Sequence, residues 1–411
     1  MLGMHLKILQ EMGSHGVSCI SMLPRRQLTA YSRYGTQQAC PGPEVDEAGA
    51  LDTLYDRCVK EGDSPVLIPY SDTWVNAVTK QMSRFKEVST PCMPDREAAE
   101  LVLDKERFCR LGQQRGYMTP MSWTLEEARE LSDGQFPIVA KPKVHRMTGN
   151  RGMVQINRQM DRLRFVVIKD RQELERFVLR ERDLLPYLTF QEYVRGMTDA
   201  IYNIGLYADR RSTVLGSVSG HKMRGYPASH GDCVLGENCE LPEELMENAL
   251  KIVRDLRLTG LAEFEYKKDS ETGDFRLIEV NPRAWSWIGI TPACGVSLPM
   301  MAYKDLTDAY DPSDFEPFSG KVKYVRLLED LANCMYLYGK DHPPFKRSPS
   351  EWLRDIKADR LVVYDFDRRD PLPSAIIMVN MLQNMTRHAL GRRGAQAERG
   401  RGTDRDPPPA M

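Results

Sequence analysis

A chain of 411 residues with 41% hydrophobic residues can bury a sizeable core, and its length predicts two or three globular domains. Its 57 Lys and Arg residues balance 58 Asp and Glu residues, so no net charge drives the molecule onto nucleic acid or an anionic membrane. No apolar run reaches the ~18 residues of a membrane span, and the N-terminus lacks the pattern of a signal peptide. Nine scattered cysteines without a C-x-x-C pair favour reduced thiols, which predicts a cytoplasmic protein.

The first 95 residues alternate between helical and extended patterns. The sequence predicts helices over 4–13, 46–61 and 72–82, and strands over 17–22 and 65–69. Repeated strand-helix units predict a parallel sheet of the flavodoxin or Rossmann type. Because such a domain usually opens on a strand, we expect its first strand to be missing from the chain or replaced by contacts elsewhere. No G-x-G-x-x-G motif supports dinucleotide binding here.

Basic residues follow the next predicted strand. After helices over 95–116 and 125–131, the apolar strand 136–142 (FPIVAKP) carries Lys141 near its end, where lysine often binds phosphate. A lone lysine in this position is nevertheless more often solvated. The loop 144–152 (VHRMTGNRG) is basic and holds two glycines, so its backbone amides can close over phosphate, although an ordinary turn has the same composition.

Two later strands also end in polar residues. The strand 188–194 (LTFQEYV) predicts an edge that offers backbone groups to adenine, with an acid nearby for ribose hydroxyls; a plain edge strand is the alternative. Strands over 200–208 and 213–219 lead to HKMR, where Lys222 and Arg224 alternate, so that both can point at one anion. A solvated strand end is an equally simple interpretation.

The stretch 261–283 (LAEFEYKKDSETGDFRLIEVNPR) is predicted to be a hairpin that carries acids. Alternation places Glu263 and Glu279 on one face of paired antiparallel strands, and Glu265 shares the face of Glu263. With the amide oxygen of Asn281 they form a hard oxygen cluster suited to Mg²⁺. Ordinary surface acids are the alternative for an isolated pair, but in IEVNPR the acid, the amide and Arg283 recur at alternate positions.

The remainder of the chain is predicted to pack on the body of the protein. Trp285 and Trp287 are expected in the core. Further elements are a linker from 311, helices near 326–338 and 349–357, a strand over 361–364, a final helix over 371–390 and a disordered tail over 391–411.

The order of these features resembles the ATP-grasp superfamily, and within it the D-aspartate-ligase-like enzymes related to the carbamoyl-phosphate synthase large subunit. The matching motifs span most of the chain, and IEVNPR after an acid-bearing strand is the most specific. They are PYSDTWVNAV, DK at 104–105, VAKP at 139–142, QEYVRG at 191–196, HKMRGYP at 221–227, LAEFEY, IEVNPR and DPLP at 370–373. The loop after Lys141 departs from the family in lacking a run of small glycines.

The resemblance implies an α/β (α+β) ATP-grasp fold with several parts. These are a parallel-sheet domain over 1–95, an ATP-grasp domain over 96–310 with lobes of about 120–195 and 196–310, and a mainly helical extension over 311–390. It also implies the roles of individual residues. Lys105 and Lys141 contact the nucleotide phosphates; Gln191, Glu192, Tyr193 and Val194 form the adenine hinge; Asp199 binds ribose; Lys222 contacts phosphate and Arg224 the substrate; Glu263, Glu279 and Asn281 bind Mg²⁺ or Mn²⁺; and Arg283 steadies an acyl phosphate.

The activity that the resemblance implies is an ATP-dependent carboxylate–amine ligase, in which an acyl phosphate is attacked by an amine. The partners are then a small carboxylate and an amine, with no nucleic acid and no membrane, and a homo-oligomer is left open. Three rivals remain at this stage. The first is a phosphotransferase that stops at phosphorylation, and the second is a nucleotide-binding regulatory protein with little turnover. The third, nucleic-acid binding through the C-terminal tail, has only the charge of the tail behind it.

Overall fold

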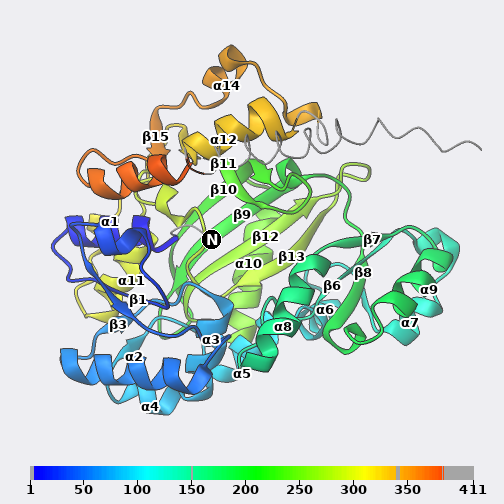
Figure 1. The fold of residues 1–411 in the computed structure, drawn as a ribbon, viewed down its shortest axis with the longest axis horizontal. Coiled ribbons are helices and arrows are strands. Elements are labelled where there is room, and N and C mark those ends of the chain that lie inside the picture. The colour runs from blue at the N-terminus through cyan, green and yellow to red at the C-terminus, as the bar shows by residue number, and fades with distance from the viewer. Residues whose placement is uncertain (1–3, 150, 339–342, 382, 384–411) are drawn as a thin grey trace, which may run out of the picture.

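The structure is a computed structural model that describes residues 4–149, 151–338, 343–381 and 383, and a seven-stranded sheet lies at its centre (Figure 1). The strand order is β13-β12-β9-β10-β11-β14-β15. Antiparallel pairing joins β9 (Ile201–Ala208), β10 (Val214–Tyr226), β11 (Asp232–Asn238), β12 (Gly260–Lys268) and β13 (Phe275–Asn281), and β14 (Val322–Val325) follows on. Only the last pair, β14 with β15 (Arg360–Val363), is parallel among the described strands of this sheet.

Both faces of the large sheet are covered by apolar groups. Helix α10 (Glu243–Leu256) packs Leu245, Ala249 and Ile252 against one face. On the other face lie α11 (Leu298–Leu306) and the side chains of Trp285 and Trp287, which are 3% and 2% exposed. The predicted core positions of both tryptophans are thus confirmed.

Glycine allows this close approach of the tryptophans. A Cβ at Gly205 would lie 2.2 Å from the Trp285 ring, and one at Gly220 would lie 2.5 Å from the Trp287 ring. Because no larger residue fits between ring and strand, these glycines let the indoles lie flat against the sheet beside its acid-bearing strands.

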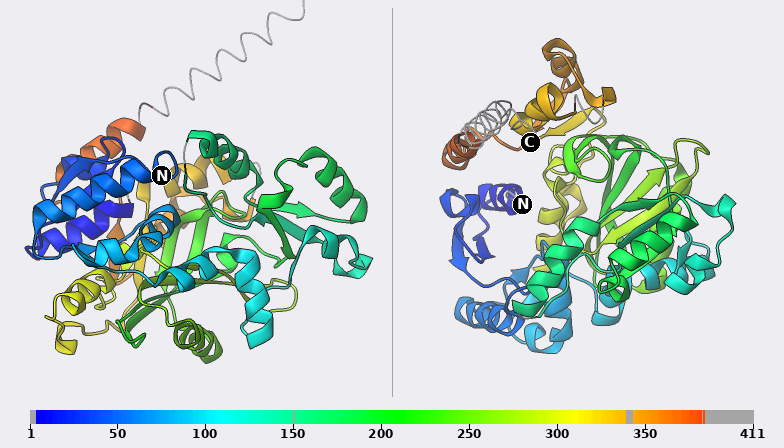
Figure 2. Two further views of the ribbon diagram at one scale, coloured as in Figure 1. Left: turned by 90° about the horizontal axis from the view of Figure 1, so that it is seen from below. Right: turned by 45° about the vertical axis from the view of Figure 1, so that its right-hand side comes forward.

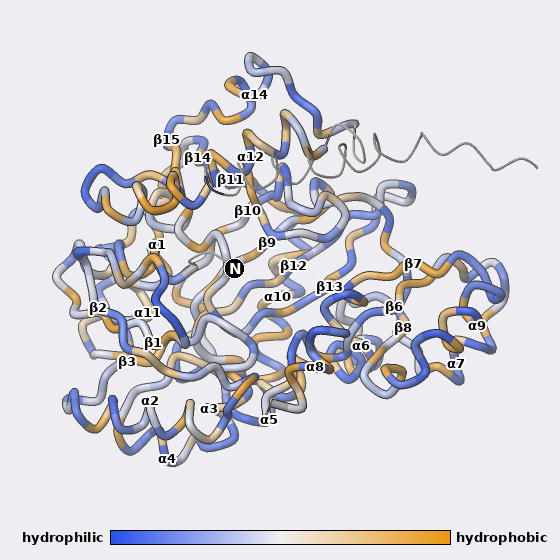
Figure 3. Tube along the Cα trace, in the orientation of Figure 1, coloured by the Kyte–Doolittle hydropathy of each residue, from blue (hydrophilic) through white to orange (hydrophobic). Residues whose placement is uncertain are grey.

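A second, four-stranded sheet forms a separate lobe on the right of Figure 1. Its order is β5-β8-β6-β7, all antiparallel, with bounds β5 (Ser122–Trp123), β6 (Ile138–Pro142), β7 (Val166–Ile168) and β8 (Leu188–Glu192). The helices of this lobe are α6 (Lys105–Arg115), α7 (Leu125–Arg129), α8 (Arg151–Met160) and α9 (Arg171–Arg180). Figure 3 shows hydrophilic residues dominating the outer turns around α9, whereas Leu174 and Phe177 of this helix face the small core of the lobe.

The N-terminal region pairs its strands in parallel, as predicted, but in two separate two-stranded sheets. They are β1 (Ile20–Leu23) with β2 (Thr36–Ala39), and β3 (Val66–Leu67) with β4 (Thr90–Pro91). The expectation of one continuous sheet is therefore wrong for the described hydrogen bonding. Strand β2 has the sequence TQQA and lacks an alternation of apolar residues, so its sequence does not predict a strand. The helices are α1 (Met4–Ser14), α2 (Glu47–Glu61), α3 (Asp72–Lys80), α4 (Met82–Lys86) and α5 (Arg96–Leu103).

The C-terminal region returns to the N-terminal one. After α12 (Leu327–Ala332), α14 (Pro349–Asp355) and β15, the chain reaches Asp370, which is 1% exposed. Asp370 accepts hydrogen bonds from the Gln10 side chain at 2.9 Å, the Ser32 hydroxyl at 2.5 Å and the Arg33 backbone N–H at 3.0 Å. Both views of Figure 2 show this orange segment beside the blue N-terminal domain.

The predicted final helix is described as helical over residues 371–381, and the predicted tail 391–411 lies outside the described residues. Within the part of the chain that is described, no helix combines the length and the apolar character needed to cross a bilayer.

Candidate nucleotide-binding site

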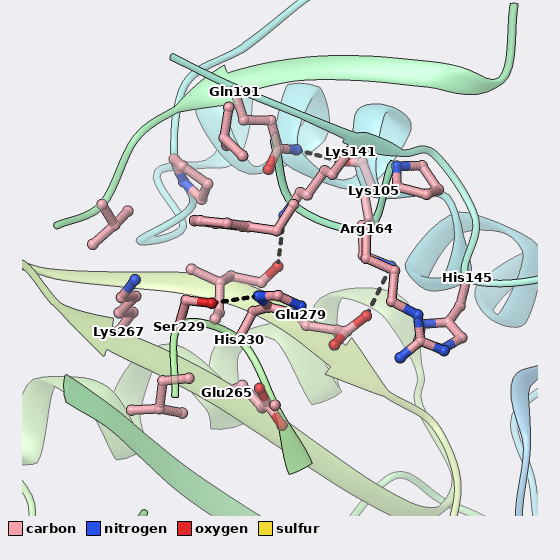
Figure 4. Close-up of a pocket in the computed structure, with 18 of the residues that line it drawn as sticks. Lys105, Lys141, His145, Arg164, Gln191, Ser229, His230, Glu265, Lys267 and Glu279 are labelled. Atoms are coloured by element: carbon pink, nitrogen blue, oxygen red, sulfur yellow. Dashed lines mark hydrogen bonds and ion pairs between the residues drawn. The ribbon is translucent and has the colours of Figure 1, made fainter. Parts of the chain in front are cut away.

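A cavity of about 190 Å³ lies between the four-stranded lobe and the large sheet (Figure 4). Strands β6 and β8 contribute to it from the lobe, and β10, β12 and β13 from the large sheet. Its lining is rich in charge. The cations include Lys105, Lys141, Arg164, Lys222 and Lys267, and the acids include Glu192, Asp232, Glu265 and Glu279.

Lys105 is held at one end of this cavity as a charged pair. Asp104 caps α6 by accepting hydrogen bonds from the backbone N–H groups of Glu106 and Arg107, which places Lys105 in the first turn. Its Nζ lies 2.7 Å from Glu279 Oε1. Burial lowers the pKa of Lys105, but the Glu279 charge outweighs burial and raises it overall. Burial likewise raises the pKa of Glu279, and the charge of Lys105 carries it well below its usual value. Both groups are therefore ionised.

Lys141 has no such counter-charge. Its Nζ donates only a long hydrogen bond of 3.5 Å to the Ile278 carbonyl, and it makes no salt bridge with any residue of the described chain. Burial and the nearby charge of Lys105 lower the pKa of Lys141 to about 8. A buried cation without a counter-charge gains free energy when an anion binds beside it, so this end of the cavity is suited to phosphate.

The predicted metal residues share one face of the hairpin, as alternation requires. Across β12 and β13, Glu265 pairs in register with Glu279, and Glu263 pairs with Asn281. Glu265 and Glu279 line the cavity, and Glu265 also accepts from Lys222 Nζ at 3.0 Å. Two opposed carboxylates are hard oxygen donors that fit a divalent cation shared with phosphate oxygens.

Glu263 lies deeper than the other two acids and is 3% exposed. Its oxygens accept hydrogen bonds from Asn203 Nδ2 at 2.7 Å, Trp287 Nε1 at 3.2 Å and Asn281 Nδ2 at 3.2 Å. Burial and the neighbouring Glu265 raise its pKa to about 8. Among the described residues no cluster of three or more His, Cys, Asp or Glu side chains is arranged to hold a metal. The metal roles of Glu263, Glu279 and Asn281 thus stay predictions.

Arg283 links this hairpin to the N-terminal domain. Its guanidinium binds Asp72 in the first turn of α3 and donates to Asn281 Oδ1 at 3.0 Å. Although burial raises the pKa of Asp72, the Arg283 charge lowers it overall, so the pair is ionised. Asp72 lies in the motif PYSDTWVNAV, but the sequence analysis assigned it no role. Its position could have indicated one, because it is an acid in the first turn of a helix that follows an apolar strand and a proline.

Three of the four predicted hinge residues line the cavity. The Gln191 side chain is 1% exposed and donates to the Lys105 carbonyl and to Cys109 Sγ. The Glu192 carboxylate accepts from the Met121 backbone N–H at 3.1 Å. Gln191, Glu192 and Val194 line the cavity, but Tyr193 does not, and it lies instead against the Phe165 ring.

Asp199, the predicted ribose acid, is exposed and stands outside the cavity lining. Its backbone carbonyl accepts a hydrogen bond of 2.7 Å from His221 Nε2. This bond anchors the start of β9, because His221 belongs to the neighbouring strand β10.

Arg224 does not reach this site, and the prediction that it converges with Lys222 on one anion is wrong. Lys222 pairs with Gly236 of β11, but Arg224 pairs with Leu235, so a β-bulge at Met223 turns the two side chains to opposite faces. Arg224 is 2% exposed and binds Asp330 on α12 with a contact of 2.6 Å. Its role is therefore structural.

The loop after β6 also differs from expectation. The prediction was that its backbone amides close over phosphate, but Gly149 N–H donates to the Pro43 carbonyl and Met147 N–H to Asn157 Oδ1. Thr148 Oγ1 accepts from Lys80 of α3 at 2.9 Å. The described part of this loop is thus docked on the N-terminal domain, and helix α8 follows it.

Aromatic and basic residues that the sequence did not single out complete the cavity. The Phe165 ring stacks on His230, with centroids 5.8 Å apart. Lys267 lies at the same end, and burial lowers its pKa to about 8 despite the charges of Asp269 and Asp199. At the other end His145 accepts from Arg164 at 3.0 Å. Isolated His, Phe and Lys residues carry no local pattern, so only the fold could bring them together.

Comparison with known proteins identifies the fold. Residues 229–328 match the family model "ATP-grasp in the biosynthetic pathway with Ter operon". A curated relative, the C-terminal section of the carbamoyl phosphate synthase large chain of Methanopyrus kandleri, is 22% identical over an alignment of 252 residues that covers 57% of this chain and 44% of the relative. The chain therefore spans less than half of the length of that relative.

Solved structures agree with this assignment. A complex of biotin carboxylase from Campylobacter jejuni has a TM-score of 0.58 and 16% identity, covering 77% of this chain and 71% of that one. The L-amino acid ligase from Bacillus licheniformis has a TM-score of 0.54 and 18% identity, covering 78% and 76%. The resemblance to the ATP-grasp superfamily and to the carbamoyl phosphate synthase large subunit is confirmed, as is the predicted α/β fold class, and the chain contains an ATP-grasp domain.

Proposed function

We propose that this protein is an ATP-dependent carboxylate–amine ligase. The observation that carries the proposal is the cavity in which Lys141 lacks a counter-charge among the described residues, beside the salt bridges Lys105–Glu279 and Lys222–Glu265. Such an arrangement is suited to a nucleotide triphosphate. The likeness to an L-amino acid ligase and to a carbamoyl phosphate synthase section supports carboxylate chemistry for this chain.

In this reaction a carboxylate oxygen of the substrate attacks the γ-phosphorus of ATP, and the bond to the β–γ bridging oxygen breaks to release ADP. An amine then attacks the carbonyl carbon of the acyl phosphate, phosphate leaves, and the amine nitrogen loses a proton to give an amide. Lys105 and Lys141 bind phosphate oxygens and offset their charge, and Arg283 steadies the acyl phosphate. Glu265 and Glu279, with Glu263 and Asn281 behind them, would hold Mg²⁺ or Mn²⁺, which would supply further charge neutralisation.

Turnover assays test this proposal directly. Purified protein with Mg-ATP and a panel of carboxylates and amino acids should release ADP, and hydroxylamine should trap the acyl phosphate as a hydroxamate. If neither ADP nor hydroxamate formed with any member of the panel, the ligase proposal would be wrong. ADP release that requires no amine, with a phosphorylated product by mass, would instead identify a phosphotransferase.

One observation favours a second candidate, a nucleotide-binding regulatory protein. The backbone amides of Met147 and Gly149 are occupied by contacts within the protein, so this loop, as described, does not cradle phosphates. Calorimetry that finds tight ATP binding, together with no ADP release, would support that candidate over both enzymes.

Nucleotide binding should weaken as pH rises from 7 to 9. Lys141 has a pKa of about 8, so its ammonium is present below pH 8 and is lost above it. An anionic ligand favours the charged form of Lys141, so MgADP binding takes up protons near pH 8. Above pH 8 the affinity for MgADP falls by up to about 10-fold per pH unit. Calorimetry in two buffers of different ionisation enthalpy measures this uptake.

The variant Lys141→Met controls for other groups, since Lys267 also has a pKa of about 8. We expect this variant to bind MgADP more weakly at pH 7 and to take up fewer protons. Equal affinity of the unmodified protein at pH 7 and pH 9 would contradict the assignment of Lys141 to the phosphates.

A further inference from the structure

Lys267 stands out among the cations of the cavity because it is almost fully buried and yet has no polar partner. It is 4% exposed, lines the cavity, and makes no hydrogen bond or salt bridge with any described residue. Its ammonium lies 5.6 Å from the centroid of the Phe165 ring and 5.9 Å from that of Tyr193. Aromatic faces attract a cation but accept none of its three N–H bonds in the manner of an oxygen.

The other lysines of the site do not share this property. Lys105 and Lys222 are each paired with a carboxylate, and Lys141 donates to a backbone carbonyl. Lys267 follows Glu265 by two residues on β12, so its side chain leaves the sheet on the same face, further along the strand. A buried ammonium that faces a cavity and has unused N–H donors is suited to donate a hydrogen bond to an acceptor atom of a ligand.

The strand register indicates which part of a nucleotide meets this lysine. Lys267 pairs with Ile201 of β9, and Ile201 comes two residues after Asp199, the predicted ribose acid. The phosphate lysine Lys105 and its partner Glu279 belong to the opposite end of the cavity, beside His145 (Figure 4). Lys267 thus lies at the nucleoside end, away from the phosphates.

We propose that Lys267 is a specificity-determining residue that donates a hydrogen bond to a ribose hydroxyl oxygen of the bound nucleotide. A ribose hydroxyl can donate its hydrogen to an acid and accept from an ammonium at the same time. Lys267 offers the ammonium from β12 inside the cavity, and the predicted ribose acid Asp199 lies in the exposed turn just before the neighbouring strand β9. This inference rests on the proposed nucleotide site, and it adds to that site a selection for ribonucleotides over deoxyribonucleotides.

Calorimetric titration with three nucleotides tests the inference without any need for turnover. MgADP, its 2′-deoxy analogue and its 3′-deoxy analogue are titrated into the unmodified protein and into Lys267→Met. We expect the unmodified protein to bind at least one deoxy analogue about 10-fold more weakly than MgADP, because a charge-assisted hydrogen bond is lost. Lys267→Met should weaken MgADP by a similar factor and leave its affinity for that deoxy analogue unchanged.

The adjacent variant Lys268→Met is the matched control. Lys268 is exposed on the same strand, and its ammonium lies 5.6 Å from the centroid of the Phe275 ring, away from the cavity lining. This variant should bind all three nucleotides as the unmodified protein does. Equal loss of affinity for all three nucleotides in Lys267→Met, or no loss, would overturn the ribose contact.

The unmodified protein alone also decides the question if Lys267→Met fails to fold. Equal affinity for MgADP and both deoxy analogues would overturn the inference whatever the variants show. Absence of MgADP binding to the unmodified protein would instead remove the nucleotide site itself, and with it the proposed function, which is a distinguishable result.

Discussion

Replacing Glu279 with Gln should lower ATP turnover by about 100-fold to 1000-fold while the protein remains folded. Glu279 lies 2.7 Å from Lys105 and faces Glu265 across the hairpin, so one carboxylate both holds a phosphate lysine and offers oxygen to a divalent cation. Glutamine preserves its size but removes the charge on which both roles depend. The measurement is ADP release under saturating substrates, with thermal unfolding as the check on folding.

The control for this variant comes from the same hairpin. Glu271 belongs to the turn between β12 and β13, and its side chain is 67% exposed and paired with Arg195. Glu271→Gln should leave turnover within about twofold, because an exposed pair contributes little. If Glu279→Gln retained more than about a tenth of the activity, its place in the phosphoryl-transfer site would be wrong.

Replacing Asp330 with Ala should lower the free energy of unfolding by about 3–5 kcal/mol. Asp330 is 0% exposed and accepts from Arg224 Nε at 2.8 Å, from Arg224 Nη2 at 2.6 Å and from Trp352 Nε1 at 2.9 Å. Removing the carboxylate leaves the Arg224 guanidinium with Asp355 as its one remaining partner among the described residues, in a largely apolar setting. Urea unfolding followed by tryptophan fluorescence measures the change.

An exposed ion pair shows what a salt bridge contributes without burial. Arg96 and Glu100 lie 2.7 Å apart on α5, with side chains 60% and 36% exposed. Glu100→Gln should change the free energy of unfolding by about 0–1 kcal/mol. A similarly small effect in Asp330→Ala would contradict the structural role that the fold assigns to Arg224.

The difference between Lys141 and Arg224 shows which side-chain positions a sequence pattern can predict. Lys141 is the fourth residue of β6, and its place at the cavity follows from a short, regular strand whose end was visible as VAKP. Arg224 was expected beside Lys222 on the same argument of alternation. Alternation fails across the β-bulge at Met223, because the extra residue in β10 places Arg224 on the opposite face from Lys222.

The loop 144–152 shows the same limit of sequence patterns. Composition alone made the loop 144–152 a candidate phosphate cradle, since glycine and basic residues are common to cradles and to ordinary turns. Its described part instead binds Pro43 and Lys80 of the N-terminal domain. Such contacts between distant segments leave no periodicity in either segment, so they are invisible until the domains are placed together.

The sequence by itself determined the face of the acidic hairpin. Period-two alternation and local antiparallel pairing put Glu263, Glu265, Glu279 and Asn281 on one side, and these are short-range properties of the strands. Only the tertiary structure decided which of these acids faces the cavity. Trp287 and Asn203, from other parts of the chain, donate hydrogen bonds to the carboxylate of Glu263.

The partners of the basic residues were likewise decided only by the tertiary structure. Arg224 meets Asp330, 106 residues further along the chain, and Arg283 meets Asp72, 211 residues before it. Lys267 reaches the cavity only because β12 lies between β9 and β13 in the sheet. Alternation specifies the side of a strand on which a residue lies, whereas the group that it meets depends on strand order and domain packing, which arise from contacts across the whole chain.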